Sequence, residues 1–283
     1  MSDYIALQIP LGTAPEGIDA QTQAEILTAE LAEWPFESFE TADGLLKAYI
    51  PGERLADCKA EVDGLLARCG VAGRYVAIET QNWNALWESN FTPVEVEGRL
   101  RIRAPFHAPA PAGVREVVIM PKMSFGTGHH ATTRLMAAAT LDLGVAGRRG
   151  LDIGSGTGVL AIVAALCGAA HVDAVDIDPW ADANCRENIA ANGVADRVEP
   201  LLGDVSRIAG RRYDFILANI NRNILTADMG AYAAALAAGG DLVMSGFLEQ
   251  DAQAVAQAAA AHGMQCVGRS DEGGWTALRV RKQ

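Results

Sequence analysis

The chain has 283 residues, of which 50% are hydrophobic and 20% are charged. This composition is typical of a packed protein with one large domain or two smaller ones, and it excludes an extensively disordered chain. The sequence has no apolar run of the roughly 20 residues that a membrane helix needs. Its first residues, MSDYIALQIP, also lack the basic start and apolar core of a signal peptide. We therefore predict a cytoplasmic protein that does not contact a membrane.

The net charge of −12 is spread unevenly along the chain. Residues 1–100 contain 17 acidic and 6 basic residues, which leaves 18 acidic and 17 basic residues for the remainder. Such an acidic region repels nucleic-acid phosphates and attracts basic partners, although it is equally compatible with a face that is merely soluble. Direct binding of nucleic acid is disfavoured in either case.

Residues 1–80 predict a small ferredoxin-like α+β domain. DYIALQIP and RYVAIET are typical strands, and residues 19–33 and 54–69 show the apolar spacing of helices. Between them, SFETADGLLKAYI indicates two strands joined by a tight turn at Asp43-Gly44. The resulting order of strand, helix, two strands, helix and strand is that of the ferredoxin-like fold.

Residues 81–115 interrupt this rhythm and are interpreted as a linker. QNWNALWESNF favours a short amphipathic helix in which Trp83 and Trp87 serve mainly in packing. Short strand-like pieces follow, and three prolines lie within residues 105–111. A segment with this proline content predicts a semi-rigid connector.

Residues 116–283 predict a Rossmann-like α/β domain, because strand-like and helix-like segments alternate from residue 148 onward. The strands are RRGLDIG, HVDAVDID, DRVEPLLGD, RYDFILANI and GGDLVMSGF, and the chain closes with MQCVGRS and WTALRVRK around the turn DEGG. In such a sheet, ligands bind at the carboxyl ends of the strands.

The segment LDIGSGTG, residues 151–158, lies between the first of these strands and a helix. Its glycines, including Gly154 and Gly156, allow a sharp turn and a close approach to a ligand. The spacing is not the dinucleotide pattern G-x-G-x-x-G, since position 159 is Val, and this disfavours an NAD-dependent oxidoreductase. Asp152 at the strand end suits a ligand with a positively charged group, such as an amino acid.

Polar residues also occur at the ends of the next three strands. Asp176 is placed to accept the hydroxyls of a ribose, Asp204 to reach an adenine amino group, and Asn219 ends the fourth strand. Each of them, taken alone, is as readily a helix cap, and Asp178 before Pro179 is a candidate for such a cap. Together with Asp152 and Gly154, they indicate a nucleoside with an amino-acid tail, namely S-adenosylmethionine.

The chain resembles the bacterial ribosomal protein L11 methyltransferases, known as PrmA. The resemblance rests on LDIGSGTGVLAI, AVDIDPWA, YDFILANI and above all FGTGHHATT at 125–133, with family motifs from about residue 120 to 247. It implies a class I methyltransferase domain with a seven-stranded, mostly parallel sheet and an antiparallel last strand. It also implies that loop 124–133 folds over S-adenosylmethionine, with Thr133 contacting the cofactor and Phe125, Gly126 and Thr127 lining its methionine end.

Other interpretations of loop 124–133 are disfavoured by its composition. The side chains of the adjacent His129 and His130 diverge, and the five cysteines are scattered without a CxxC pair, so we predict no metal site. The loop lacks the GK[ST] ending of a phosphate loop. No Gly-x-Ser-x-Gly nucleophile elbow is present, and Ser245 in MSGF is interpreted as strand packing.

The resemblance implies transfer of methyl groups to lysine and N-terminal amines of ribosomal protein L11, with S-adenosylhomocysteine as the product. Methyl transfer to an amine requires the donor and a neutral acceptor held in line, and little acid–base machinery. Asn219 is the candidate for orienting the amine through its carbonyl oxygen, while His129 and His130 are weak candidates for a base. The acidic residues 1–80 are expected to recognise the basic substrate, and the protein is expected to be a monomer.

Four alternatives remain open at this point. The chain is also compatible with a related protein-lysine methyltransferase that acts on another acceptor, or with a small-molecule methyltransferase, which would leave the acidic domain unexplained. A non-catalytic, ribosome-associated protein that only binds S-adenosylmethionine is a third possibility. Direct methylation of ribosomal RNA is disfavoured by the charge.

Overall fold

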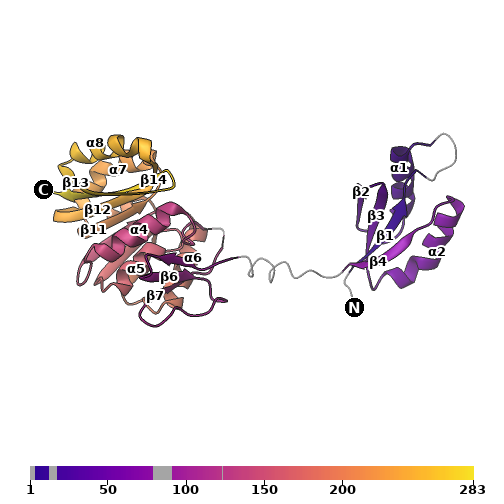
Figure 1. The fold of residues 1–283 in the computed structure, drawn as a ribbon, viewed down its shortest axis with the longest axis horizontal. Helices are drawn as coiled ribbons and strands as arrows, with labels where there is room; N and C mark the ends of the chain where they lie inside the picture. Colours follow the sequence, from indigo (N-terminus) through magenta and orange to yellow (C-terminus); the bar gives the residue numbers. More distant parts are fainter. Residues whose placement is uncertain (1–3, 13–17, 79–90, 123) are drawn as a thin grey trace. The chain divides into compact units, whose positions relative to one another are not determined.

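The computed structural model describes residues 4–12, 18–78, 91–122 and 124–283. The chain divides into two compact units, Met1–Asn90 and Phe91–Gln283 (Figure 1). The predicted helix with Trp83 and Trp87 lies outside the described residues. Within the described ranges, no helix has both the length and the apolar character required to span a membrane.

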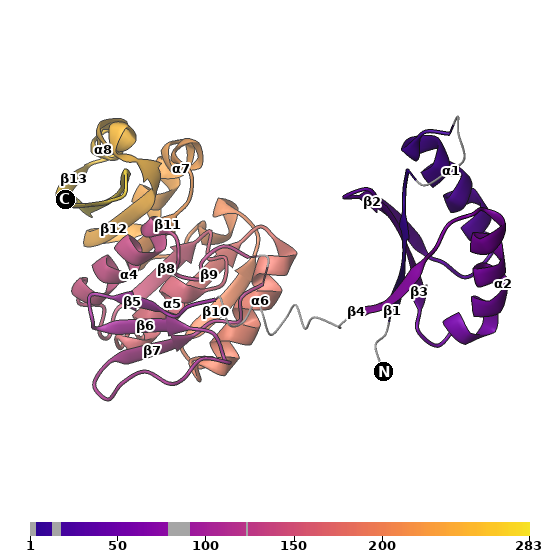
Figure 2. The ribbon, with the colours of Figure 1, turned by 45° about the vertical axis from the view of Figure 1, so that its right-hand side comes forward.

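The N-terminal unit has the predicted ferredoxin-like order. Its elements are β1 (Tyr4–Pro10), α1 (Ala20–Leu31), β2 (Ser38–Ala42), β3 (Leu45–Pro51), α2 (Leu55–Arg68) and β4 (Arg74–Ile78). The sheet order is β2-β3-β1-β4 with antiparallel pairs throughout, and both helices cover one face of it (Figure 2). Asp43 and Gly44 both have positive φ and join the paired residues Ala42 and Leu45, so the predicted tight hairpin turn is confirmed.

Residues 91–115 differ from the prediction of a linker, because they pack as part of the second unit. They form β5 (Val94–Val96) and β6 (Leu100–Arg103), which join β7 (Arg115–Val118) in a three-stranded sheet. Their apolar residues are buried in the same hydrophobic core as the helices that pack on one face of the seven-stranded sheet described below; they are Val94, Val96, Leu100 and Ile102. The alternation of these apolar residues outweighs the prolines, which lie in the connection between β6 and β7.

The second unit is built on a seven-stranded sheet of order β10-β9-β8-β11-β12-β14-β13. The strands are β8 (Arg149–Ile153), β9 (His171–Asp176), β10 (Val198–Leu202), β11 (Tyr213–Asn219), β12 (Leu236–Leu248), β13 (Met264–Glu272) and β14 (Trp275–Lys282). Strands β8 to β12 pair in parallel, whereas β14 is antiparallel to both neighbours. The prediction of a mostly parallel sheet with an antiparallel last strand is confirmed.

Helices cover both faces of this sheet (Figures 1 and 2). Two buried apolar clusters lie between the sheet and these helices. One lies beneath α4 (Ala131–Asp142), α5 (Val159–Leu166) and α6 (Pro179–Ala191), and the other beneath α7 (Arg222–Ala235) and α8 (Ala252–Ala260). Short 3-10 turns η1 (Val205–Ile208) and η2 (Glu249–Asp251) follow β10 and β12. This two-sided cover leaves the ends of the strands as the places where a ligand can approach.

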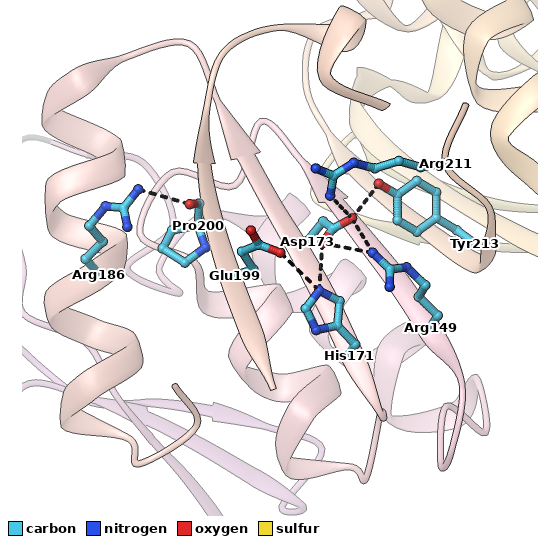
Figure 3. A network of polar contacts seen from close by, with 8 residues as sticks. All are labelled: Arg149, His171, Asp173, Arg186, Glu199, Pro200, Arg211 and Tyr213. Carbon is cyan, nitrogen blue, oxygen red and sulfur yellow. Dashed lines mark hydrogen bonds and ion pairs between the residues drawn. The ribbon is translucent and has the colours of Figure 1, made fainter. Parts of the chain in front are cut away.

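A buried polar network connects the amino ends of four strands, β8, β9, β10 and β11 (Figure 3). Asp173 is fully buried and accepts hydrogen bonds from Tyr213 Oη at 2.6 Å, Arg211 at 2.7 Å and Arg149 at 3.1 Å. His171 Nε2 lies 2.7 Å from Asp173 and 3.5 Å from Glu199. Burial alone would raise the pKa of Asp173, but these donors outweigh it and hold the pKa below its ordinary value. The two guanidinium groups already neutralise Asp173, which disfavours a metal ion among these side chains.

We predict that Asp173→Ala destabilises the second unit by about 3 kcal/mol, because it leaves two guanidinium groups and a buried tyrosine hydroxyl without their shared acceptor. The pKa of Asp173 is lower in the folded than in the unfolded state, so its contribution is complete above about pH 4 and is lost as pH falls through the folded value. Urea unfolding of wild type and variant at pH 7 and pH 3 tests this. Equal midpoints at pH 7 would contradict the assigned role.

Candidate functional site

The carboxyl ends of β8, β9, β10 and β11 surround a cavity of about 450 Å³. Six residues expected from the sequence to bind a cofactor line it: Phe125, Gly154, Gly156, Asp176, Asp204 and Asn219. Asn219 is also the candidate for orienting the amine. The six residues come from separate segments of the chain and meet because the carboxyl ends of parallel strands share one edge of the sheet.

The glycines after β8 are required by close backbone packing. Gly154 and Gly156 have φ of 70° and 55°, a region that other residues rarely adopt. A Cβ on Gly156 would lie 2.3 Å from the Phe125 carbonyl oxygen, and one on Gly154 would lie 2.2 Å from Ile220 Cγ2. The glycine loop therefore contacts both loop 124–133 and the connection after β11. These three segments form adjoining parts of the cavity wall.

Asp176 points its carboxylate toward the glycine loop at the end of β9. Its Oδ2 accepts a hydrogen bond from the Gly156 N–H at 2.8 Å, and its Oδ1 accepts one from the Asp178 N–H at 3.0 Å. The cap of α6 is Asp178, which accepts from the Trp180 N–H at 2.9 Å. Asp176 is consequently not the helix cap, and its place at the cavity is compatible with ribose binding.

Asp204 combines the two roles that the sequence left open. It lines the cavity, and its Oδ1 also accepts from the Ser206 N–H at 2.9 Å at the start of η1. Side-chain and backbone hydrogen bonds with Ser206 lower the pKa of its carboxyl group. A carboxylate fixed in this way can still accept a hydrogen bond from an amino group of a ligand, since it has further lone pairs.

Two buried oxygen atoms at the site lack a hydrogen-bond partner within the described part of the chain. They are Oδ1 of Asn219 and Oγ1 of Thr133. Thr133 lines a second hollow of about 290 Å³ with loop residues that include Phe125, Gly126 and Thr127. Because buried polar atoms are nearly always paired, each of these oxygens is suited to a ligand group.

Asp152 does not line the cavity, in contrast to the sequence prediction. It is buried beneath the glycine loop, where its Oδ2 accepts from the Ala161 N–H of α5 at 3.0 Å. Burial is the main cause that raises the pKa of Asp152 to about 7, and the negative charge of Asp176 adds a smaller increase. The hydrogen bond from Ala161 acts in the opposite direction and lowers it. Strand alternation turns Asp152 toward α5, so it supports the loop from behind.

The histidines of loop 124–133 have structural partners. His130 caps α4, accepting from the Thr132 N–H, and its ring lies edge-on between Phe125 at 5.4 Å and Trp275 at 4.6 Å. His129 Nε2 lies 2.9 Å from the Thr92 carbonyl oxygen. Neither histidine lines the main cavity, whereas His130 lines the second hollow with Thr133. His129 and His130 therefore stay weak candidates for a base.

Sequence reasoning missed the apolar part of the cavity wall. Ile177, directly after Asp176, has 69% of its surface exposed, and it lines the cavity with other apolar residues that include Val205, Ile220 and Ile224. Such a wall suits the faces of a purine ring. The isoleucine directly after a strand-end aspartate could have indicated this wall. It was not decisive, because an apolar residue at that position is as readily buried in the core.

The fold and the site together define a class I methyltransferase. The order of the parallel strands reverses at β8, and the last strand is antiparallel. The cavity lies at the carboxyl edge of the sheet, with a glycine loop and strand-end carboxylates. The chain matches the family "Ribosomal protein L11 methyltransferase (PrmA)" over residues 16–283. It therefore belongs to the ribosomal protein L11 methyltransferase family.

Individual relatives agree with this assignment. A ribosomal protein L11 methyltransferase of Porphyromonas gingivalis is 41% identical over 98% of this chain and 97% of its own length. One from Pelotomaculum thermopropionicum is 33% identical over 97% and 98% of the two chains. A crystal structure of a ribosomal protein L11 methylase from Lactobacillus delbrueckii subsp. bulgaricus, 26% identical, covers 68% of this chain and 100% of that chain with a TM-score of 0.62.

We predict that Asp152 makes the protein less stable as pH rises toward neutrality. Its folded pKa of about 7 lies above the unfolded value, so the folded state holds a proton that the unfolded state has released. Between about pH 4 and pH 7, stability should fall by up to about 1.4 kcal/mol per pH unit relative to Asp152→Asn. Urea unfolding of both proteins at pH 5, 6 and 7 without added ligand checks this, and parallel pH profiles would refute it.

Proposed function

We propose that this protein transfers methyl groups from S-adenosylmethionine to lysine side-chain and N-terminal amines of ribosomal protein L11. The observation that carries the proposal is the cavity in which Asp176, Asp204 and Asn219 meet loop 124–133 in a member of this family. The names of the relatives support ribosomal protein L11 as the acceptor.

Different residues of the cavity would bind different parts of the cofactor. Asp176 would bind the ribose hydroxyls, and Asp204 the adenine amino group, with Ile177 and Val205 against the ring. The glycine loop, Thr133 and residues 125–127 would hold the methionine end. When bound, S-adenosylmethionine supplies an electrophilic methyl group that an amine attacks in line.

The chain's contribution to the chemistry is mainly positioning. Asn219 Oδ1 has no hydrogen-bond partner among the residues that the structure describes. At the cavity wall it would accept a hydrogen bond from an N–H of the incoming amine and direct the nitrogen lone pair toward the methyl group. Asn219 is neutral and does not favour the ammonium form, whose lone pair is blocked. The apolar walls and the nearby positive charge of the cofactor lower the pKa of the amine, which would release its proton to water.

The N-terminal unit would recruit the substrate through its charge. Its described helices expose Glu25 and Glu30 on α1 and Glu61 on α2, and Glu33 is exposed just after α1. Ribosomal proteins are typically basic, so this surface would speed encounter and favour docking. We further propose a cytoplasmic monomer that binds its protein substrate without contacting nucleic acid directly.

Incubation with methyl-labelled S-adenosylmethionine and an extract of methylation-deficient bacteria, followed by mass spectrometry, tests the function. We expect label on one small ribosomal protein, and Asp176→Ala and Thr133→Ala should weaken cofactor binding by roughly tenfold or more, because each removes a direct contact. Asp182→Ala is the matched control, since Asp182 pairs with Arg186 on α6 and is not a lining residue.

Each other outcome of this labelling experiment favours a named alternative. Label on a different protein would indicate a related lysine methyltransferase, and label on a small molecule would indicate a small-molecule enzyme. Label removed by ribonuclease would indicate an RNA methyltransferase. Cofactor binding without any label would favour the non-catalytic reading.

The charge of the N-terminal unit gives a separate prediction. The combined variant Glu25→Gln, Glu30→Gln and Glu33→Gln should raise KM for ribosomal protein L11 severalfold at low salt, with little change above about 0.5 M salt, where surface charges are screened. The matched control carries Glu97→Gln, Glu187→Gln and Asp196→Asn, exposed residues of the second unit. Equal effects of the two sets on KM would show that net charge, and not this surface, matters.

A further inference from the structure

A hollow of about 510 Å³ lies at the edge of the seven-stranded sheet opposite the cofactor cavity. Its wall comes from the connection before β8, the first parts of β11 and β12, and the last part of β14. Because β14 is antiparallel to β12, its carboxyl end lies beside the amino end of β12. None of the residues that line this hollow takes part in the proposed reaction.

Three arginine side chains line the hollow around one buried carboxylate. Asp241 is 2% exposed, and its Oδ1 accepts hydrogen bonds from Nε of Arg279 and Nε of Arg281, both at 3.0 Å. Arg281 lies opposite Asp241 in the β12–β14 ladder, and Arg279, two residues earlier, has its side chain on the same face. Nη2 of Arg148 lies 3.6 Å from Asp241 Oδ2. Three guanidinium groups therefore share this carboxylate.

The positive charge of the hollow exceeds what Asp241 requires. Burial raises the pKa of Asp241, but the hydrogen bonds and charges of Arg279 and Arg281 outweigh it and hold the pKa below its ordinary value. Arginine remains charged across the physiological pH range. Together with Asp214, the lining residues carry three positive and two negative charges.

Two of these arginines keep unused hydrogen-bond donors. Within the described ranges, Nη1 and Nη2 of Arg279 and Nη1 of Arg281 donate no hydrogen bond. Arg148 differs, because its Nη1 donates to the Leu143 carbonyl oxygen at 3.2 Å beyond the end of α4. Arg281 alone gives Asp241 two hydrogen bonds, so securing β14 to β12 does not require Arg279.

The two arginines with unused donors are open to solvent and already fixed in place. The side chains of Arg279 and Arg281 are 30% and 43% exposed. The adjoining wall, residues 237–240, contains only alanine and glycine, so no large side chain there covers them. Pairing with Asp241 holds both guanidinium groups before a ligand arrives, which lowers the entropic cost of binding.

We propose that this hollow binds the phosphate group of a small anionic ligand, which Arg279 and Arg281 hold through their unused N–H donors. Guanidinium groups favour phosphate because their paired N–H donors match its oxygen atoms. The ligand is free phosphate or a phosphorylated small molecule. Charges more than about 10 Å away are screened at physiological salt, so the net negative charge of the chain acts weakly here. The proposal goes beyond methyl transfer and does not depend on it.

Isothermal titration calorimetry of the full chain with sodium phosphate and with sodium pyrophosphate, at constant ionic strength, tests the site. We expect saturable binding of both probes. Arg279→Gln should weaken it by about fivefold or more, because the guanidinium fork is lost while two other arginines still neutralise Asp241. Asp214→Asn should strengthen it by about threefold, since it removes a negative charge from the wall. The new side-chain oxygen can still accept from the Arg149 N–H, as Asp214 does at 2.8 Å.

Arg269→Gln is the matched control. Arg269 lies on β13, pairs with Asp271 at 2.9 Å and does not line the hollow. This variant should bind both probes within about twofold of wild type. Titrations with saturating S-adenosylhomocysteine should give the same Kd, because the cofactor cavity then contains its own ligand.

Several outcomes would overturn the phosphate site. They are the absence of saturable binding, equal weakening by Arg279→Gln and Arg269→Gln, and loss of binding when S-adenosylhomocysteine is present. The arginines would then serve only to neutralise Asp241. If urea unfolding shows that Arg279→Gln is not folded, Asp214→Asn decides, and unchanged or weaker binding by it contradicts the proposal.

The two probes distinguish the sources of the phosphate group. Pyrophosphate that binds about tenfold or more tighter than phosphate would support the site and indicate a ligand with two linked phosphates. Equal affinities would support a single phosphate group. Neither result requires methyl transfer, so failure of the proposed function and failure of this site are observed separately.

Discussion

The cavity depends on the hydrogen bonds that Thr157 makes between two loops distant in sequence. Its N–H donates to the Phe125 carbonyl oxygen at 2.9 Å, and its hydroxyl donates to the Gly126 carbonyl oxygen at 2.8 Å. Its own carbonyl oxygen accepts from Asn188 of α6 at 2.9 Å. Thr157 is fully buried, so these bonds are not exchanged with water. They hold loop 124–133 against the glycine loop, and the ring of His130 in the same loop contacts those of Phe125 and Trp275.

The two ends of the large sheet have different electrostatic designs. At the amino ends, Asp173 is surrounded by arginine side chains and a tyrosine hydroxyl and is saturated with hydrogen bonds. At the carboxyl ends, Asn219 and Thr133 keep buried oxygens without partners among the described residues. The hydrogen bonds of Asp173 stabilise the fold, whereas the buried oxygens of Asn219 and Thr133 are available to bind a ligand. The proposed division of labour, with stability at one edge and chemistry at the other, follows from this contrast.

Recognition and catalysis are proposed to reside in separate units. The N-terminal unit carries exposed acidic residues on α1 and α2, and the second unit is nearly neutral overall. Long-range attraction would therefore collect a basic protein through charges on a different unit from the one that contains Asn219. The acidic residues of the cavity are assigned to the cofactor, and a further carboxylate next to the amine would stabilise the unreactive ammonium form.

Local signals in the sequence determined a large part of this description. The tight turn at Asp43-Gly44, the strand and helix alternation, the glycine loop and the strand-end positions of Asp176, Asp204 and Asn219 all follow from short-range stereochemistry and periodicity. Tertiary structure decided what depends on side-chain direction and on contacts between distant segments. It turned Asp152 behind the glycine loop, drew residues 91–115 into the core of the second unit, assigned His130 to a helix cap and placed Trp275 beside the loop over the cavity. Packing between distant segments sets these outcomes, and no local pattern in a single sequence encodes which segments will meet.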